Sequence, residues 1–298
     1  FDAGTGKVIF SGSSSQTIRT NGNNFYNVTL SNDNINLLAG GGNLIIGGGL
    51  KISNGQNPIV TTNNQDFIVY GNTDGTAGFP AESLTIDAGS GNIIFWGYIH
   101  GFGGGQDSSG LTSMVIADAA DVDFYGTIAI TAGLAQDAGT GTTTFHSAVS
   151  TGADTNVITG AIAFVDSGSI SVSYPELADL TLIAQTGSIT STSSAATDLV
   201  ADNLVLSAAK GIGSDDPLET QVSNLAARVT DPDAAGNINI NNSIDLVLRD
   251  IAGWGDGYAI KNFGSGSISI TVDSDDSNLI VDDAVISNGG DIDLRAKG

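Results

Sequence analysis

Short apolar runs separated by polar turn residues follow one another along almost the whole chain. In residues 7–72 the runs are short, as in Phe25–Leu30 and Phe67–Tyr70, and are punctuated by Gly, Asn or Asp. Runs of this length between turn residues predict β-strands. The linkers are too short and too rich in glycine for crossover helices, so the pattern favours an all-β fold.

Residues 160–298 add a fixed period. Leu-x-Leu motifs start at Leu180 and Leu204, and Ile-x-[Ile/Leu] motifs start at Ile268 and Ile292, so the offset is the same in both pairs. A further copy at Ile238 lies farther than this offset from Ile268, which indicates an insertion in one turn. Alternation of apolar with polar residues gives each strand one inward face. We therefore predict a right-handed parallel β-helix (β-solenoid) with coils of roughly 24 residues.

A second repeat supports this fold. The motif Asp-Ala-Gly-[Ser/Thr]-Gly, followed by a short run that ends in Phe, occupies residues 2–10, 87–95 and 137–145. We interpret the glycines as corners of a coil, the Asp as a turn cap and the Phe as an inward side chain.

Domain organisation follows from these repeats. We expect residues 1–298 to form a single continuous β-solenoid, with 97–110, which lacks a clean period, as a loop extruded from the stack. The first motif copy lacks a lead-in strand and 291–296 reads as one more strand, so we expect a segment of a longer chain; a complete mature protein with frayed termini is the alternative. Residues 216–228 fit a short helix or a strand, and we predict a strand because Leu218, Thr220 and Val222 alternate with polar residues.

Composition narrows the partners. The chain has 298 residues, is 40% hydrophobic and carries a formal net charge of −23, so nucleic acid and anionic membranes would be repelled. Strong acidity with few lysines suits a salty or extracellular setting, where salt screens self-repulsion. The absence of Cys excludes disulfides and thiolate chemistry, and no apolar run approaches the length of a membrane span.

The three Asp-Ala-Gly motifs, together with residues 25–37, 204–213 and 217–226, resemble the repeat regions of large bacterial exoproteins of the filamentous-haemagglutinin-like type. The resemblance covers most of the chain apart from the loop near 97–110. It implies a parallel β-helix exported to the bacterial cell surface, with a role in adhesion, biofilm matrix or fibre formation. We therefore expect a structural and adhesive shaft of an extracellular surface protein or fibre. We also expect association with itself, end to end, or with adjoining solenoid coils, and surface glycans or a receptor on a host or neighbouring cell as candidate further partners.

Residues that could carry catalysis are scarce. The two histidines, His100 and His146, are interpreted as turn or loop residues. A glycosidase needs two carboxylates at a fixed separation, and the basic partners that a lyase needs are scattered. The candidate carboxylates are Asp215, Asp216, Asp231, Asp233, Asp273, Asp275, Asp276, Asp282 and Asp283. We predict that the chain is not an enzyme and needs no cofactor; Ca²⁺ held by these Asp clusters is the alternative.

Two aromatic clusters are the candidate binding sites. The first contains Trp96, Tyr98 and Phe102, and the second contains Trp254 and Tyr258. Exposed aromatic rings bind sugars by stacking on their apolar faces, whereas the simpler interpretation is that these rings cover a coil edge or an insertion. A carbohydrate-active or glycan-binding β-helix protein is therefore the alternative function.

Overall fold

The fold is a parallel β-solenoid of about 11 coils that lie about 24 residues apart, which confirms the predicted fold class. The computed structural model describes residues 5–12, 14–32, 34–37, 41–53, 55–76, 82–101, 110–172, 178–193, 195–251, 253–254 and 256–297. These residues form 33 strands and no helix, so none of their segments is a helix that could cross a membrane. The chain divides into two compact units, 1–152 and 153–298.

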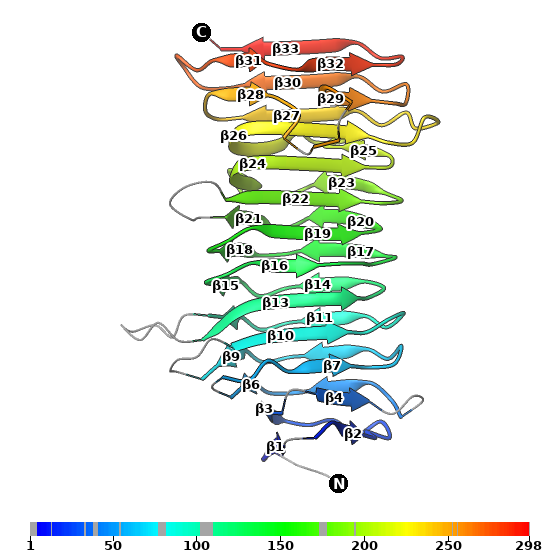
Figure 1. The fold of residues 1–298 in the computed structure, drawn as a ribbon, viewed down its shortest axis with the longest axis vertical. Coiled ribbons are helices and arrows are strands. Elements are labelled where there is room, and N and C mark those ends of the chain that lie inside the picture. Colours follow the sequence, from blue (N-terminus) through cyan, green and yellow to red (C-terminus); the bar gives the residue numbers. More distant parts are fainter. Residues whose placement is uncertain are drawn as a thin grey trace. The chain divides into compact units, whose positions relative to one another are not determined.

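Unit 1 contains three columns of parallel strands, and each strand pairs with the equivalent strand of the next coil (Figure 1). The first column is β1 (Lys7–Ser11), β3 (Asn27–Ser31), β6 (Leu50–Ile52), β9 (Thr73–Gly75), β12 (Ile99–His100), β15 (Ile128–Ile130) and β18 (Ala148–Thr151). The second is β2 (Gln16–Ile18), β4 (Asn34–Leu37), β7 (Ile59–Thr61), β10 (Glu82–Asp87), β13 (Leu111–Asp118) and β16 (Leu134–Gln136). The third is β5 (Leu44–Ile46), β8 (Phe67–Val69), β11 (Ile93–Phe95), β14 (Val122–Phe124) and β17 (Thr142–Phe145).

Unit 2 follows the same plan, but two of its strands are long enough to pair with more than one strand of a neighbouring coil. These strands are β24 (Leu199–Ala208) and β26 (Leu218–Val229). The strands before β26 are β19 (Thr155–Thr159), β20 (Ala161–Phe164), β21 (Ser169–Val172), β22 (Asp179–Ala184), β23 (Ser188–Ser191) and β25 (Gly211–Ile212). Those after it are β27 (Ile238–Asn242), β28 (Leu246–Leu248), β29 (Tyr258–Asn262), β30 (Ile268–Val272), β31 (Leu279–Val281), β32 (Ala284–Ser287) and β33 (Ile292–Ala296).

The core of unit 1 contains a ladder of phenylalanine rings. Phe95, Phe124 and Phe145 are register partners and are almost completely buried. Their ring centroids are 5.8 and 5.5 Å apart and the rings are nearly parallel, while Phe67 meets Phe95 edge to face at 5.8 Å. Burying each ring stabilises the stack by about 2–3 kcal/mol. The Phe residues of the second and third Asp-Ala-Gly motifs thus point inward as predicted; residues 2–4 of the first copy lie outside the described residues.

Asparagine and aspartate side chains link the coils at the corners. In unit 1 the side-chain oxygen of each such residue accepts a hydrogen bond from the backbone N–H at the equivalent corner of the next coil. The chain of bonds runs from Asn43 to Asp66 (3.1 Å), Asn92 (2.9 Å), Asp121 (3.1 Å) and Thr142 (2.8 Å). Each bond stabilises the stack by about 1 kcal/mol. This repeated bond explains why a chain with so few charged residues is rich in Asn and Asp at its turns.

The remaining predictions can be compared with the observed elements. Residues 218–229 form β26, which confirms the strand over the short helix. Within the predicted loop 97–110, Ile99 and His100 instead form β12, because they pair with β9 and β15; residues 102–109 lie outside the described residues. Ile238 and Ile268 are register partners, so the longer offset between them does reflect an insertion.

Candidate functional site

Trp96 of the first aromatic cluster is part of a ladder on the outer face of unit 1. Tyr70, Trp96, Tyr125 and His146 each follow an inward residue of the third strand column, and alternation turns them outward. The Trp96 and Tyr125 rings are 3.9 Å apart and the Tyr125 and His146 rings 4.0 Å apart, nearly parallel in both pairs. Tyr70 lies 6.1 Å from Trp96. We call these four residues the outer ladder.

Glycine at the next position allows the coils to approach closely beside the outer ladder. A Cβ atom on Gly97 would lie 2.3 Å from the carbonyl oxygen of Gly71, and one on Gly126 would lie 2.1 Å from that of Gly97. Both distances are far below any real contact of a Cβ atom, so only glycine fits. The close backbone contact lets rings of successive coils stack face to face.

This stacking changes the interpretation of Trp96. Its side chain is 45% exposed, but its ring lies between Tyr70 and Tyr125. The ladder therefore presents mainly ring edges to solvent, which differ from the open ring face that stacks on a sugar. Tyr98 lies outside this ladder; it is 50% exposed and stacks on His100 at 5.3 Å. Phe102, the third predicted member of the cluster, lies outside the described residues.

Each histidine faces one aspartate of the preceding coil. His100 Nδ1 lies 3.6 Å from Asp74 Oδ1, and His146 Nε2 lies 3.6 Å from Asp123 Oδ1. Burial raises the pKa of both aspartates, and the facing histidine acts in the opposite direction. These side-chain pairs also link adjacent coils.

The second aromatic cluster belongs to an insertion in unit 2. Leu225 pairs with Leu248, and Ala227 pairs with Ile260. Between these two pairs the sequence therefore has residues 249–259, where the preceding coil has only Ala226. This segment, which we call the insertion, contains both Trp254 and Tyr258.

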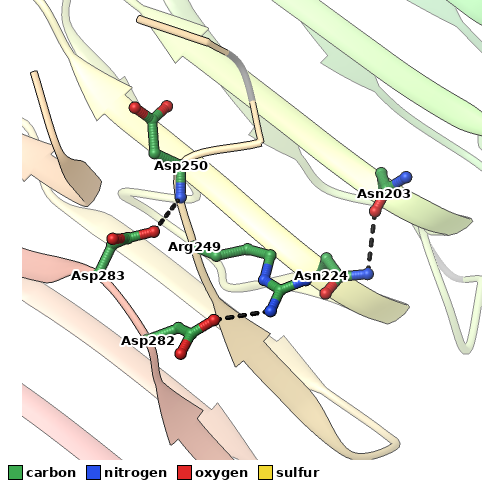
Figure 2. A network of polar contacts seen from close by, with 6 residues as sticks. All are labelled: Asn203, Asn224, Arg249, Asp250, Asp282 and Asp283. Carbon is green, nitrogen blue, oxygen red and sulfur yellow. Dashed lines mark hydrogen bonds and ion pairs between the residues drawn. The ribbon is translucent and has the colours of Figure 1, made fainter. Parts of the chain in front are cut away.

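Ion pairs and hydrogen bonds fix the start of the insertion to the following coil. Arg249 Nη2 donates to Asp282 Oδ2 at 2.7 Å, and the backbone N–H of Asp250 donates to Asp283 Oδ2 at 2.9 Å (Figure 2). Figure 2 also shows the hydrogen bond of 2.9 Å that the side-chain amide of Asn224 on β26 donates to Asn203 Oδ1 on β24. Asp282 and Asp283, which were candidate catalytic or Ca²⁺-binding carboxylates, thus hold the base of the insertion.

Two cations lie against the aromatic rings of this region. The guanidinium carbon of Arg228 is 3.2 Å from the ring centroid of Trp254. Lys261 Nζ lies 4.0 Å from the Tyr258 ring and 4.2 Å from the Phe263 ring. Arg228 and Lys261 are register partners on β26 and β29, so they project side by side. Cation–π contacts of this kind contribute about 0.5–2 kcal/mol each.

Arg228 is unusually enclosed for an arginine. Only 16% of its side chain is exposed, and burial lowers its pKa below the ordinary value, with Asp256 and Asp250 acting in the opposite direction. Among the described residues, its Nε and Nη2 atoms have no hydrogen-bond acceptor. Asp256 Oδ2 is 3.6 Å from Arg228 Nη2 and 3.8 Å from Lys261 Nζ.

Two further candidate aspartates have partners of their own. Asp273 pairs with Lys297 at 2.8 Å, and Asp231 accepts a hydrogen bond from the N–H of Asp233 as a turn cap. Within the part of the chain that the structure describes, no three side chains of His, Cys, Asp or Glu lie together as metal ligands would. The absence of a cofactor stays a prediction, with Ca²⁺ as its alternative.

Sequence reasoning found Trp96 of the outer ladder, and Trp254 and Tyr258 of the insertion. It missed Tyr70, Tyr125 and His146, although an aromatic residue or His follows the inward residue of four coils, and in three of them glycine comes next. It also left Arg228 without a role. No sequence signal links Arg228 to Trp254, because the register that brings them together depends on the insertion.

Comparison with known proteins does not assign the chain to a family. No family model, no curated protein and no solved structure matches the chain. The β-solenoid repeat architecture is shown by the structure, whereas membership of the filamentous-haemagglutinin-like group stays a prediction from the motifs.

Proposed function

We propose that this chain is a structural and adhesive β-solenoid shaft of an extracellular bacterial surface protein or fibre. The observation that carries the proposal is the regular parallel register of the coils, in which backbone hydrogen bonds, inward ladders and Asn/Asp corners all repeat from coil to coil. Such a stack is stable as a sum of neighbour contacts and can be extended without a closed core. The proposal assigns the chain no catalytic step, no membrane insertion and no nucleic-acid partner.

End-to-end association is the second part of the proposal. Val281 and Ile292 are 49% and 46% exposed, whereas their register partners in the preceding coil, Leu248 and Ile268, are fully buried. A strand edge with apolar side chains beside it is able to pair with another coil. The occupant is a second copy of the chain or an adjoining coil.

Sedimentation velocity and electron microscopy test this association. We expect the protein to associate with increasing concentration, and Val281→Asp with Ile292→Asp to abolish the association. Ile280→Asp is the matched control, because Ile280 is 50% exposed but pairs with the outward position of Val247. A protein that stays monomeric at all concentrations would contradict end-to-end association between copies.

Location and adhesion need separate measurements. Antibodies against the purified chain should label intact cells of the source bacterium, and beads coated with the chain should be retained on cell surfaces. Labelling only after cell lysis would contradict the extracellular location.

Activity on a panel of neutral and acidic polysaccharides, lost in Asp→Asn variants, would contradict the purely structural function.

Glycan binding is the second candidate, and a groove in unit 2 favours it. The groove is lined by polar side chains that can bind sugar hydroxyl groups, among them Ser223, Asn224, Asp245 and Ser277. A glycan array distinguishes the polar groove of unit 2 from the exposed aromatic residues of unit 1. Loss of glycan binding in Asn224→Ala assigns the binding to the groove, and loss in Tyr98→Ala or Trp96→Ala assigns it to unit 1. Absence of binding to any glycan would leave the shaft as the function.

A further inference from the structure

The enclosed guanidinium of Arg228 needs an acceptor that the described residues do not supply. Its Nε and Nη2 atoms are buried and make no hydrogen bond with any of those residues. A buried donor without a partner is destabilising, and more so when the group is charged. Arg228 is therefore placed for an acceptor that comes from elsewhere.

Asp256 marks where such an acceptor would lie. Its Oδ2 atom is 3.6 Å from Arg228 Nη2 and 3.8 Å from Lys261 Nζ. Both distances exceed the roughly 2.7–2.9 Å of a hydrogen bond between charged groups. The insertion thus holds a carboxylate between two cations, close enough for Coulomb attraction and too far for direct hydrogen bonds.

We propose that Arg228 and Lys261 form a binding site for one carboxylate group of an external ligand, and that this carboxylate replaces Asp256 between the two cations. The Asp256 side chain would turn away when the ligand binds. The site does not depend on the shaft function, and either can fail without the other.

The surroundings favour a single carboxylate. The planar guanidinium fork of Arg matches the two oxygens of a carboxylate. The chain carries a net charge of −23, so a dianion such as phosphate, or a polyanion, would be repelled more strongly than a monoanion. The rings of Trp254, Tyr258 and Phe263 beside the cations keep water away and strengthen the ion pair. The ligand is therefore a monocarboxylate on an otherwise neutral body, either an acidic sugar or an amino-acid derivative.

Tryptophan fluorescence can report on this site alone. The chain has two tryptophans, so Trp96→Phe leaves Trp254, which lies on Arg228, as the only one. We expect a saturable change in its emission with galacturonate or with N-acetylphenylalanine, at constant ionic strength, with a dissociation constant on the order of 1 mM. Methyl galactoside, which lacks the carboxylate, should give no change. Response to only one of the two acids identifies the source of the carboxylate.

Variants separate a binding site from a structural ion pair. In the same background, Asp256→Asn removes the internal competitor and should tighten binding about tenfold. Arg228→Gln should abolish binding, and Arg228→Lys, which keeps the charge without the planar fork, should weaken it. Arg249→Gln is the matched control, because Arg249 belongs to the same insertion but pairs with Asp282; it should bind as the parent does.

Three results would overturn the proposal. The first is no saturable change with either acid in both the parent and Asp256→Asn. The second is an equal response to methyl galactoside. The third is weaker binding in Asp256→Asn. If circular dichroism shows that Arg228→Gln does not fold, the result for Asp256→Asn decides the matter, because Asp256 is exposed and makes no hydrogen-bond-length contact with either cation.

Discussion

The outer ladder of unit 1 and the insertion of unit 2 use the same residue types in opposite ways. In the outer ladder, Trp96 stacks on Tyr70 and Tyr125, its equivalents in neighbouring coils. In the insertion, Trp254 stacks on Arg228, which is a cationic residue and lies on the regular strand β26. The ladder repeats one corner from coil to coil, whereas the insertion occurs once and has no equivalent in the adjacent coils.

The difference shows how a repeat fold separates stability from specificity. A residue in the ladder finds its partner through register alone, so similar rings recur and their faces contact each other. Trp254 in the insertion lies outside the strands and has no register partner, so its partner can have complementary charge and chemistry. Sites that bind something else are therefore expected where the repeat is interrupted.

Phe124→Ala should have the largest effect on stability. It removes the middle ring of the buried ladder formed by Phe95, Phe124 and Phe145, which we call the inner ladder. Phe124 is almost fully buried between Phe95 and Phe145. Loss of the ring leaves a cavity, and we expect a decrease of about 3–5 kcal/mol in the free energy of unfolding, measured with urea. Phe263→Ala in unit 2, where the ring is only partly buried, should cost clearly less; equal losses would contradict the importance of the inner ladder.

The same substitution at two glycines compares the regions directly. Gly126→Ala places a Cβ 2.1 Å from the Gly97 carbonyl oxygen and should cost about 3 kcal/mol, because backbone must move. Gly253→Ala in the insertion meets nothing within 4 Å, but its φ of +64° is strained for alanine and should cost about 1 kcal/mol. Melting temperatures of the two variants measure the difference. The reverse order would show that the corner can relax.

Double-mutant cycles should distinguish the two kinds of stacking. We expect Trp96→Ala and Tyr125→Ala to couple by about 1 kcal/mol, independent of salt, because ring stacking involves no net charge. Arg228→Met and Trp254→Ala should couple by about 1–2 kcal/mol, with a coupling that weakens in high salt because the site remains partly accessible. Equal salt dependence of both couplings would remove the distinction.

The smallest effect concerns Asp123, which faces His146 of the outer ladder. Burial raises the pKa of this carboxyl above its ordinary 3.8, so the native state binds the proton more tightly than the unfolded state and the charged form is a penalty at neutral pH. Asp123→Asn should therefore raise the melting temperature at pH 7 by at most a few degrees. The gain should shrink as the pH falls through the raised pKa and vanish below the ordinary one.

Asp137→Asn is the control for this measurement. Asp137 is exposed, so this substitution should change the melting temperature at pH 7 little. A lower melting temperature for Asp123→Asn at pH 7 would show instead that attraction to His146 outweighs the burial of Asp123.

Much of this molecule could be predicted from the sequence because its contacts are repeated locally. The alternation of apolar and polar residues determined the strands and their inward face, and the regular spacing of the Leu-x-Leu and Ile-x-Ile motifs determined the stacking. The longer offset from Ile238 to Ile268 indicated an insertion, and Phe95 and Phe145 could be assigned to the core from one motif. These features depend on residues that are close in sequence or one coil apart. The same pattern of strands, turns and inward residues therefore recurs in many coils of one chain.

Only the tertiary structure decided which side chains of different coils meet. The stacking of Trp96 on Tyr125 and the contact of Arg228 with Trp254 depend on register across coils of unequal length. The coil that joins Val8 to its partner Val28 is much shorter than the one that joins Leu246 to Leu279. Coils of different length keep the same inward face, as in the series Val69, Phe95, Phe124 and Phe145, so spacing along the sequence does not by itself identify the partner of a side chain. For that reason the sequence alone determined the β-solenoid and its aromatic clusters, while the partners of each ring and the enclosed pair of cations were decided by the folded chain.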